Sequence, residues 1–467
     1  MMADREVTVG RDGDWERAGL SAGRVAGIFE REAELFESRT PESARLLRLA
    51  ERRMPRGVPM GWMADLYPNP PVFAAGGEGS SFRDVDDNVY LDFNLCDLST
   101  FVGFAPPALT RAVSEQAGRG VQFLLPGEDD EVVAGELARR FGMPFWQFTL
   151  SASQANTEAL RLARLATGKS RTVVFGGRYH GHIHDTLQAT ADGRPEQEYL
   201  GLPADAGTDT LVAGFNDLDS VERLLGQGEV AAVIAEPVLT NCTVVLPESG
   251  FHQGLRQLCD QYGALLILDE THTQFAVWGG ATGYFGLEPD IVTGGKGIAG
   301  AIPIGTYGIT PRLAELMEEN GDSDFSVEPG VATGGTLFAN ALSMAAARAT
   351  LTELLTEEAY LRVGELGERM ADGIDAVVAE HRLPWRAHRF GGRSGYCLAP
   401  ELPADEAEAG HSLIPLLAAA RSTYLANRGV WDAIATSGPS ISIAHTEDDV
   451  DRYLEVLDDF LSEAAPR

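Results

Sequence analysis

Lysine is almost absent from this chain. Lys and Arg together number 37, and only two of them are lysines, Lys169 and Lys296. Arginine stays protonated and is a poor nucleophile, whereas a desolvated lysine amine can lose its proton and attack a carbonyl. A lysine kept among so many arginines is therefore a candidate for amine chemistry, although a codon bias against lysine would also leave a few at random.

Net positive charge, paired cysteines and long hydrophobic runs are missing as well. The formal net charge is −32 at pH 7, so the chain lacks the basic footprint that nucleic acid or an anionic membrane requires. Its four cysteines show neither CxxC nor metal-site spacing, which favours reduced thiols. No run has the length of a membrane span, and the first residues lack the apolar core of a signal peptide. We therefore expect a cytoplasmic protein without nucleic-acid or membrane partners.

The order of apolar and helical patterns predicts two domains, because 467 residues exceed one ordinary core. Between residues 105 and 339, near-continuous apolar runs such as ALLILDE alternate with helical patterns, which is typical of a parallel sheet covered on both faces. Residues 1–104 and 340–467 contain helices and short strands. We expect a large α/β domain, residues 105–339, with a mostly parallel central sheet, and a smaller α+β domain built from residues 1–104 and 340–467.

Polar residues follow several of the predicted strands, where ligands bind in parallel α/β sheets. The run FWQFTL is followed by Ser151, Ala152 and Ser153 at the start of a helix. Such a start suits a phosphate group, or serves as a plain helix cap. The run ALLIL ends in Asp269, a carboxylate that needs a partner: an arginine, a helix start or the protonated ring nitrogen of a ligand.

A tyrosine and several histidines follow the predicted strand RTVVFGG. The stretch RYHGHIHD contains Tyr179, His180, His182 and His184. Histidines at alternate positions, with no cysteine or further histidine nearby, are poor evidence for a metal site, and we expect none. An aromatic ring at a strand end could instead stack on a planar ligand.

Lys296 completes a recognisable set of groups. It stands in DIVTGGKGIAGAIPIG, and Thr336 stands beside a glycine pair that precedes another helix. A lysine for a Schiff base, an acidic partner for a pyridinium nitrogen and a phosphate cradle are the requirements of pyridoxal 5′-phosphate. Neither lysine fits GxxxxGK[ST], and no GxGxxG follows a strand, which argues against a P-loop and a dinucleotide site.

The chain resembles the class III (subgroup II) aminotransferases of fold type I. Within them it looks most like the branch of glutamate-1-semialdehyde aminomutase-like and β-amino-acid aminotransferases. The resemblance runs from about Arg52 to the last helix and rests on SASQANTEALRLAR, YHGH, VIAEPV, LLILDET, DIVTGGKGIAGAIPIG and GGTLFAN. It implies the fold of the type I PLP-dependent transferases, and a homodimer with shared active sites.

The resemblance also implies catalytic roles for three residues. Lys296 would carry the cofactor as a Schiff base, the internal aldimine, and would move the substrate proton. Asp269 would keep the pyridine nitrogen protonated, and Tyr179 would stack on the ring. Further cofactor contacts would come from the phosphate loop, the YHGH and EP motifs, the turn after Asp269 and, from the neighbouring subunit, the GGT motif: Ser151, Ala152, Ser153, His180, Glu236, His272 and Thr336.

One departure from the family bears on the substrate. Aminomutase relatives carry a carboxylate-binding arginine in a GVNSPVR segment, and here GVPMGWMAD places Met63 at that position. Met60, Trp62 and Met63 would form an apolar wall that cannot bind a carboxylate as a guanidinium does. Arg178 and Arg393 are candidates for that task, unless they are structural.

The apolar wall favours one of several activities. It favours transfer of an amino group from a hydrophobic amino acid, α or β, or from an amine to a 2-oxo acid. The alternatives are an aminomutase, an amino-acid epimerase and a non-catalytic relative that keeps the fold, although the intact lysine argues against the last.

Overall fold

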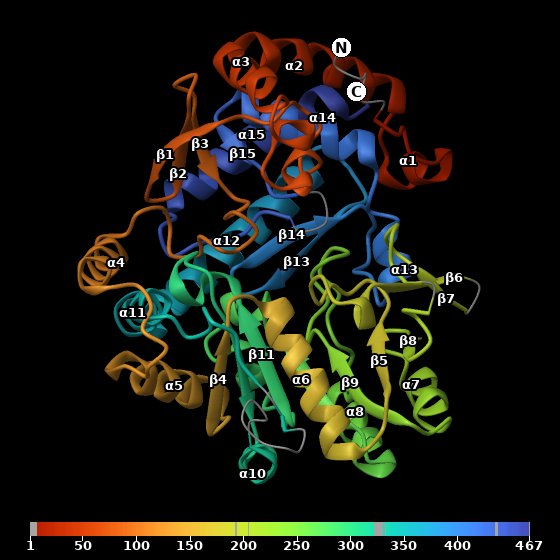
Figure 1. The fold of residues 1–467 in the computed structure, drawn as a ribbon. Helices are drawn as coiled ribbons and strands as arrows, with labels where there is room; N and C mark the ends of the chain where they lie inside the picture. The colour runs from red at the N-terminus through yellow and green to blue at the C-terminus, as the bar shows by residue number, and fades with distance from the viewer. Residues whose placement is uncertain are drawn as a thin grey trace. The chain divides into compact units, whose positions relative to one another are not determined.

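The computed structural model describes residues 7–191, 194–203, 205–321, 330–331, 333–434 and 438–466. The chain divides into two compact units (Figure 1). The large unit comprises Pro107–Leu361 and Ala404–Ala407, and the small unit comprises Met1–Pro106, Arg362–Pro403 and Glu408–Arg467.

The second boundary lies later in the chain than residue 339, where the sequence had placed it. Helix α11 (Ala341–Ala349) packs against α4, α5 and the turn that begins at Lys296, so it is part of the large unit. Most of its alanine-rich sequence is buried there, because small side chains let a helix approach its neighbours closely.

The large unit is built on a seven-stranded sheet of order β4-β12-β11-β10-β9-β5-β8. Strand β12 runs antiparallel to both its neighbours, and the other pairings are parallel. This confirms the expected α/β fold with a mostly parallel sheet. The strands are β4 (Phe145–Thr149), β5 (Arg171–Phe175), β8 (Thr210–Ala213), β9 (Val230–Ala235), β10 (Leu265–Asp269), β11 (Ile291–Gly295) and β12 (Gly305–Ile309).

Helices cover this sheet because its central strands are mostly apolar and buried on both faces. Every residue of β9, β10 and β11 is buried, and α6 packs across β9, β11 and β12. The helices of the large unit, besides α11, are α4 (Pro107–Arg119), α5 (Glu128–Phe141), α6 (Ala152–Thr167), α7 (Leu218–Leu225), α8 (Phe251–Tyr262), α9 (Gly280–Phe285) and α10 (Pro311–Asn320). Shorter elements are η3 (His184–Thr186), β6 (Gln188–Ala191), β7 (Arg194–Gln197), η4 (Thr273–Phe275), η5 (Lys296–Ala299) and the π-helix η6 (Thr350–Leu354).

The small unit combines segments from both chain ends around a sheet of order β1-β2-β3-β15 and a β13-β14 hairpin. Helix α2 packs along α14, and α15 contacts both. Its elements are α1 (Asp12–Ala18), α2 (Ala22–Arg39), α3 (Pro41–Ala50), η1 (Pro55–Gly57), η2 (Gly61–Ala64), β1 (Ala74–Glu78), β2 (Ser81–Asp84), β3 (Val89–Asp92), β13 (Arg386–Phe390), β14 (Arg393–Cys397), α14 (Pro415–Asn427), β15 (Val430–Trp431) and α15 (Glu447–Ala464). The unit boundaries cut α12 (Glu357–Glu380) and α13 (Glu406–Gly410).

The direction of the parallel strands decides where polar side chains gather in the large unit. Asp269 ends β10, Glu236 follows β9 and Lys296 follows β11, and these three strands are neighbours that run in the same direction. Their carboxyl ends therefore meet at one edge of the sheet. Within the described ranges, no helix is long and apolar enough to cross a membrane.

Candidate functional site

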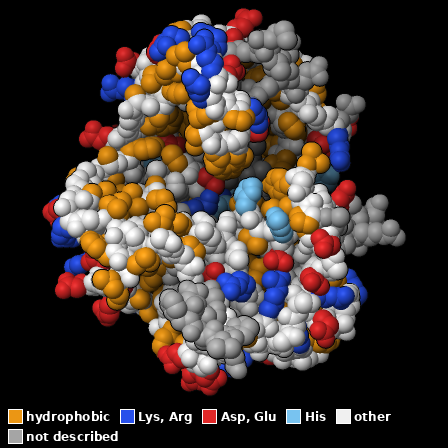
Figure 2. Space-filling view, in the orientation of Figure 1, with side chains coloured by type: hydrophobic (Ala, Val, Ile, Leu, Met, Phe, Trp, Pro, Cys, Tyr) orange, Lys and Arg blue, Asp and Glu red, His pale blue; other side chains and the backbone are white. Residues whose placement is uncertain are grey.

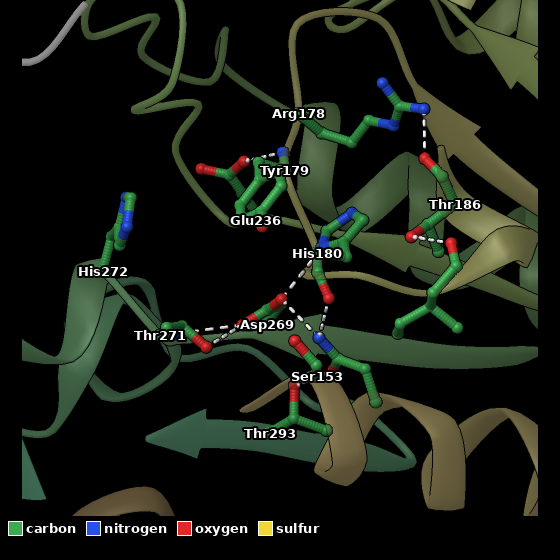
Figure 3. Close-up of polar contacts among 12 residues, drawn as sticks. Ser153, Arg178, Tyr179, His180, Thr186, Glu236, Asp269, Thr271, His272 and Thr293 are labelled. Atoms are coloured by element: carbon green, nitrogen blue, oxygen red, sulfur yellow. Dashed lines mark hydrogen bonds and ion pairs between the residues drawn. The ribbon is translucent and has the colours of Figure 1, made fainter. Parts of the chain in front are cut away.

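Asp269 is a buried carboxylate held by three side chains. Its Oδ2 accepts a hydrogen bond from Asn156 at 2.8 Å and lies 2.8 Å from Nδ1 of His180. Its Oδ1 accepts the backbone N–H of Thr271 at 3.0 Å and its hydroxyl at 2.5 Å. Burial opposes ionisation, but the bond from His180 and its charge, with help from Thr271 and Asn156, hold the pKa of Asp269 below its ordinary value. The strand thus ends in an ionised group. Figure 3 shows the contacts of Asp269 with His180 and Thr271.

His180 is oriented by this carboxylate. Because ionised Asp269 can only accept, Nδ1 of His180 carries the proton. The backbone carbonyl of His180 accepts a bond from Asn156 at 3.0 Å, and the amide oxygen of Asn156 accepts the hydroxyl of Thr293 at 2.5 Å. Thr293 pairs with Asp269 in the β10–β11 register. A continuous network therefore joins the YHGH loop, α6 and the strand that leads to Lys296.

The start of helix α6 lies between the YHGH loop and the strand before Lys296. Ser151 caps the helix by accepting the backbone N–H of Gln154 at 3.4 Å. A Cβ at Gly295 would lie 3.1 Å from the backbone nitrogen of Ala152, so β11 ends against this helix start. The first N–H groups of a helix and its positive end suit an anion such as phosphate.

Ser153 binds the loop on the other side of this helix start. Its Oγ accepts the backbone N–H of His182 at 3.2 Å. Gly181 has a φ of +94°, and a side chain there would collide with Ser153. The glycine of YHGH is therefore required both by the left-handed backbone and by the close approach of the serine.

Lys296 follows β11 in a strained conformation. Its φ is +55°, a left-handed value that costs an L-residue about 1–2 kcal/mol. Gln274, which is buried, donates its side-chain amide to the carbonyl of Gly295 at 3.2 Å and so holds the peptide just before the lysine. Strain of this kind gathers where the surroundings fix a functional side chain.

Tyr179 and Glu236 lie side by side at the same edge of the sheet (Figure 3). Glu236 Oε1 accepts the backbone N–H of Tyr179 at 2.8 Å, and Tyr179 as a whole is 38% exposed. The ring lies edge-on to His182, with centroids 6.4 Å apart. Burial raises the pKa of Glu236 above its ordinary value. A partly exposed aromatic side chain at this edge of the sheet suits stacking on a planar ligand.

His272 is joined to Glu236 rather than to Asp269. It is buried, and its Nδ1 lies 2.7 Å from the hydroxyl oxygen of Thr240, which in turn lies 2.8 Å from Glu236 Oε2. The expected cofactor residue is therefore part of a second polar network beside the first.

Arg178 has a structural position, which corrects the expectation that it binds a substrate carboxylate. Its guanidinium is buried, forms an ion pair with Glu198 at 2.5 Å and donates to the backbone carbonyls of Thr186 and Gln188. Figure 3 shows the side chain turned away from Asp269 toward Thr186. It holds the base of the β6–β7 hairpin, and a substrate would have to break this ion pair.

The other expected substrate residues belong to the small unit. Arg393 is buried and donates to the hydroxyl of Ser440 at 3.0 Å, an internal contact. Met60, Trp62 and Met63 lie on or next to the short helix η2 and are 44%, 47% and 43% exposed. An apolar contact surface is thus present on that unit, and its role stays a prediction.

Thr336 lies at the surface of the large unit. It is exposed, and its backbone carbonyl accepts the side-chain amide of Gln122 at 2.5 Å. It lines a cavity of about 810 Å³ together with residues of β4, α5 and α6. Its expected contact with the phosphate of a neighbouring subunit stays a prediction.

The sequence analysis missed several residues of these networks, among them Asn156, Thr240 and Gln274. Asn156 carried a visible signal, because it is a polar residue on the apolar face of α6 and is wholly buried. Thr240 and Gln274 carried none, since their importance depends on contacts with His272 and Gly295, which are distant in sequence.

The combined geometry fits a ligand with an anionic group and a protonated ring nitrogen. The helix start offers the anion site, Asp269 the ionised partner for the nitrogen, and Tyr179 a planar surface. Lys296, directly after the strand that pairs with β10, supplies an amine. These are the groups that pyridoxal phosphate requires.

Comparison with known proteins gives the same answer. The family model described as aminotransferase class-III matches residues 62–391. The glutamate-1-semialdehyde 2,1-aminomutase of Roseiflexus castenholzii is 37% identical over 392 residues, which cover 81% of this chain and 87% of that protein.

Solved structures agree with the sequence matches. A glutamate-1-semialdehyde-aminomutase from Pseudomonas aeruginosa PAO1 is 38% identical with a TM-score of 0.91, and the match covers 95% of this chain and 99% of that one. A lysine-to-alanine variant of a glutamate-1-semialdehyde-aminomutase from that organism was solved in complex with PMP. The β-phenylalanine aminotransferase of Variovorax paradoxus is 25% identical with a TM-score of 0.83, covering 94% and 97% of the two chains. The chain is a member of the class III aminotransferase family, an enzyme whose cofactor is pyridoxal phosphate.

Proposed function

We propose that this enzyme transfers an amino group from a hydrophobic amino acid, α or β, or from an amine to a 2-oxo acid. The observation that carries this proposal is Met63, which stands where aminomutase relatives have a carboxylate-binding arginine. Met60 and Trp62, next to it, are also large, apolar and exposed. Such a surface favours an apolar substrate group over a carboxylate.

The residues of the large unit have distinct tasks in this reaction. When bound, pyridoxal phosphate draws electrons away from the substrate carbon that carries the amine. Asp269, kept ionised by its three partners, holds a proton at the ring nitrogen, and Tyr179 stacks on the ring. The amine of Lys296 holds the cofactor and takes the proton from the substrate carbon. The start of α6, from Ser151 to Ser153, binds the phosphate.

An aminomutase is the second candidate, because the relatives with 37–38% identity bear that name. Such an enzyme moves the amino group within one molecule and so keeps both ends of its substrate in the site. An amino-acid epimerase would use the same lysine and carboxylate without releasing an oxo product.

We also propose a homodimer in which Thr336 reaches the phosphate of the partner's cofactor. The loop around Gln122 exposes several apolar side chains next to Thr336, and Figure 2 shows hydrophobic side chains gathered on the visible face over α4, α11 and α5. An exposed patch this apolar is typical of a protein–protein interface, which supports the proposed dimer. The patch comprises Val121, Phe123, Leu124, Leu125 and Leu337, which are 50%, 53%, 68%, 75% and 52% exposed.

The proposed activity is tested by asking which single amino donor converts the bound cofactor to its amino form. Enzyme loaded with pyridoxal phosphate receives one amine at a time, without an acceptor, while its visible absorbance is followed. The donors are α-amino acids, β-amino acids, arylalkylamines and glutamate-1-semialdehyde. Conversion to the amino form of the cofactor, with release of an oxo product from a hydrophobic donor, is the expected result.

Two other outcomes would overturn it. Turnover of glutamate-1-semialdehyde to a rearranged product, with no discharge by hydrophobic donors, makes the enzyme an aminomutase. Loss of optical activity in an amino acid, without release of an oxo product, makes it an epimerase.

A further inference from the structure

A buried glutamine amide bridges the two strand ends that carry Asp269 and Lys296. Nε2 of Gln274 lies 3.3 Å from the carbonyl oxygen of Thr271 and 3.2 Å from that of Gly295. A carboxamide has two N–H protons, so this one group can donate to both carbonyls at once. Because carbonyl oxygens only accept, the nitrogen of the amide, and not its oxygen, must face them.

Each of the two carbonyls stands beside a residue with a proposed catalytic role. Gly295 directly precedes Lys296. Thr271 binds Oδ1 of Asp269 through its backbone N–H at 3.0 Å and through its hydroxyl at 2.5 Å. The amide of Gln274 therefore joins the peptide of the lysine to the turn that holds the carboxylate.

Gln274 is itself held firmly by its surroundings. Its backbone N–H donates to the carbonyl of Glu270 at 3.0 Å, and its backbone carbonyl accepts the hydroxyl of Tyr360 at 2.8 Å. Tyr360 is buried, and its ring packs against Trp278 with the centroids 5.6 Å apart. A Cβ at Gly294 would lie 3.1 Å from Oε1 of Gln274, so the glutamine lies directly on β11.

The backbone at Lys296 explains why such a bridge is needed. Its left-handed φ of +55° is unfavourable for a residue with a side chain, and it persists only where the neighbouring structure holds it. The carbonyl of Gly295 and the N–H of Lys296 belong to one planar peptide group. A bond that fixes this carbonyl therefore fixes φ of the lysine, and with it the direction in which its side chain leaves the backbone.

We propose that Gln274 is a positioning residue that sets the direction of the Lys296 side chain relative to Asp269. It acts through the carbonyl of Gly295 and takes no part in proton transfer. The inference rests on the roles proposed above for Lys296 and Asp269 but not on which amine is the substrate.

The test compares loss of this amide with loss of an equivalent amide elsewhere. Gln274→Met keeps a long side chain and removes both donors. Asn216, whose amide donates to the carbonyls of Leu246 at 3.0 Å and Ala404 at 2.8 Å, supplies the control, Asn216→Ala. We expect kcat of Gln274→Met to fall by about 10-fold to 100-fold, the cost of a small misplacement of a reacting group. Its KM should stay within about threefold, because the loss falls on the transition state.

A second readout needs no substrate. The visible absorbance of the PLP-loaded enzyme is titrated with pH, because the nitrogen of Lys296 that holds the cofactor titrates according to its place beside the ring. We expect the midpoint to move by about half a pH unit or more in Gln274→Met and to stay at the wild-type value in Asn216→Ala. Lower stability alone does not move this midpoint, since only folded, loaded enzyme gives the absorbance.

A smaller side chain serves if Gln274→Met does not fold. Gln274→Ala leaves room for water, which can bond each carbonyl without tying the two together. The same fall in kcat and the same shift of the midpoint are expected.

An unchanged kcat and an unchanged midpoint in the Gln274 variant would overturn the proposal. So would equal changes in Asn216→Ala, or a loss that appears in KM alone, because a general loss of stability or of substrate binding would then be responsible. Failure of the proposed transamination is distinguishable, since hydrophobic donors would then leave the wild-type cofactor unchanged while the titration still decides the role of Gln274. A wild-type enzyme without a lysine-linked cofactor would overturn the role of Lys296 and that of Gln274 with it.

Discussion

Nδ1 of His180 and Oδ2 of Asp269 lie 2.8 Å apart, and both side chains are almost completely shielded from solvent. Because the bond keeps Asp269 ionised, the carboxylate can hold a proton on the cofactor ring. We predict that Asp269→Asn lowers kcat by about 100-fold or more, in line with other losses of a preorganised charged group. The value of kcat is measured by steady-state kinetics, with the amino donor that converts the cofactor to its amino form in the test above.

Asp269 is the last residue of β10, and Asp290, a carboxylate that precedes β11 and contacts the opposite end of β10, provides the control. Asp290 accepts the backbone N–H of Leu266 and the guanidinium of Arg256, each at 2.9 Å. Asp290→Asn should reduce stability and leave kcat within about twofold, because it lies at the opposite end of β10. Equal losses of kcat in the two variants would contradict the role of Asp269.

The second lysine is predicted to be structural. Nζ of Lys169 donates to the carbonyls of Tyr262 at 2.7 Å and Gly263 at 2.8 Å, at the C-terminal end of α8. Lys169→Ala should cost about 0.5–1 kcal/mol of stability, because those carbonyls can turn to water. Cofactor binding and kcat should not change. Thermal unfolding and absorbance titration with the cofactor measure both effects, and a variant that no longer binds the cofactor would refute this assignment.

The apolar loop is predicted to hold two subunits together. Leu124→Glu combined with Leu125→Glu should shift the enzyme toward monomers and raise the concentration of cofactor needed for half saturation, because Thr336 would no longer reach the partner's site. Leu200, a fully exposed leucine elsewhere on the large unit, supplies the matched control, Leu200→Glu. Sedimentation velocity measures the proportions of monomer and dimer in the double variant and in the control. A double variant that stays dimeric would show that the interface lies on another surface.

Two buried histidines predict loss of stability in acid. Burial and the nearby charge of Arg393 lower the pKa of His388 to about 3, and burial lowers that of His445 to about 4, both from an ordinary value of 6.5. Since the folded pKa lies below the unfolded one, their stabilising contribution is complete above pH 6.5. It is lost as the pH falls toward 3–4, because only the unfolded chain binds these protons.

Replacement of one of these histidines isolates its share of the effect. The urea midpoint is measured between about pH 7 and pH 4.5 for wild type and for His388→Leu, which does not titrate. Each such histidine lowers the free energy of unfolding by up to about 1.4 kcal/mol for each pH unit below its unfolded pKa. The variant should therefore show a shallower decline whatever its stability at neutral pH. Identical slopes would mean that His388 is protonated in the folded state.

The sheet and the principal site residues could be predicted from the sequence for one physical reason. Strands buried on both faces are apolar throughout, so a polar residue at the end of such a strand stands out. Asp269 and the stretch before Lys296 were recognised in this way, and parallel pairing brings their strand ends together.

Other features depend on contacts between distant residues and left no local signal. The ion pair of Arg178 with Glu198 arises from the β6–β7 hairpin, so the arginine looked available when it is not. The bond between Thr240 and His272 joins two different strand ends. The sequence placed the end of the large unit before α11. An alanine-rich helix gives no sign in its own sequence of the elements that it packs against, and α11 packs against the large unit.

The attachment of the cofactor is the most direct measurement. The loaded enzyme is reduced with borohydride, which fixes the cofactor on the amine that holds it, and the modified peptide is identified by mass spectrometry. Only two lysines compete. The account predicts the label on Lys296 alone and none in Lys296→Ala. A label on Lys169, or no lysine label at all, would contradict it.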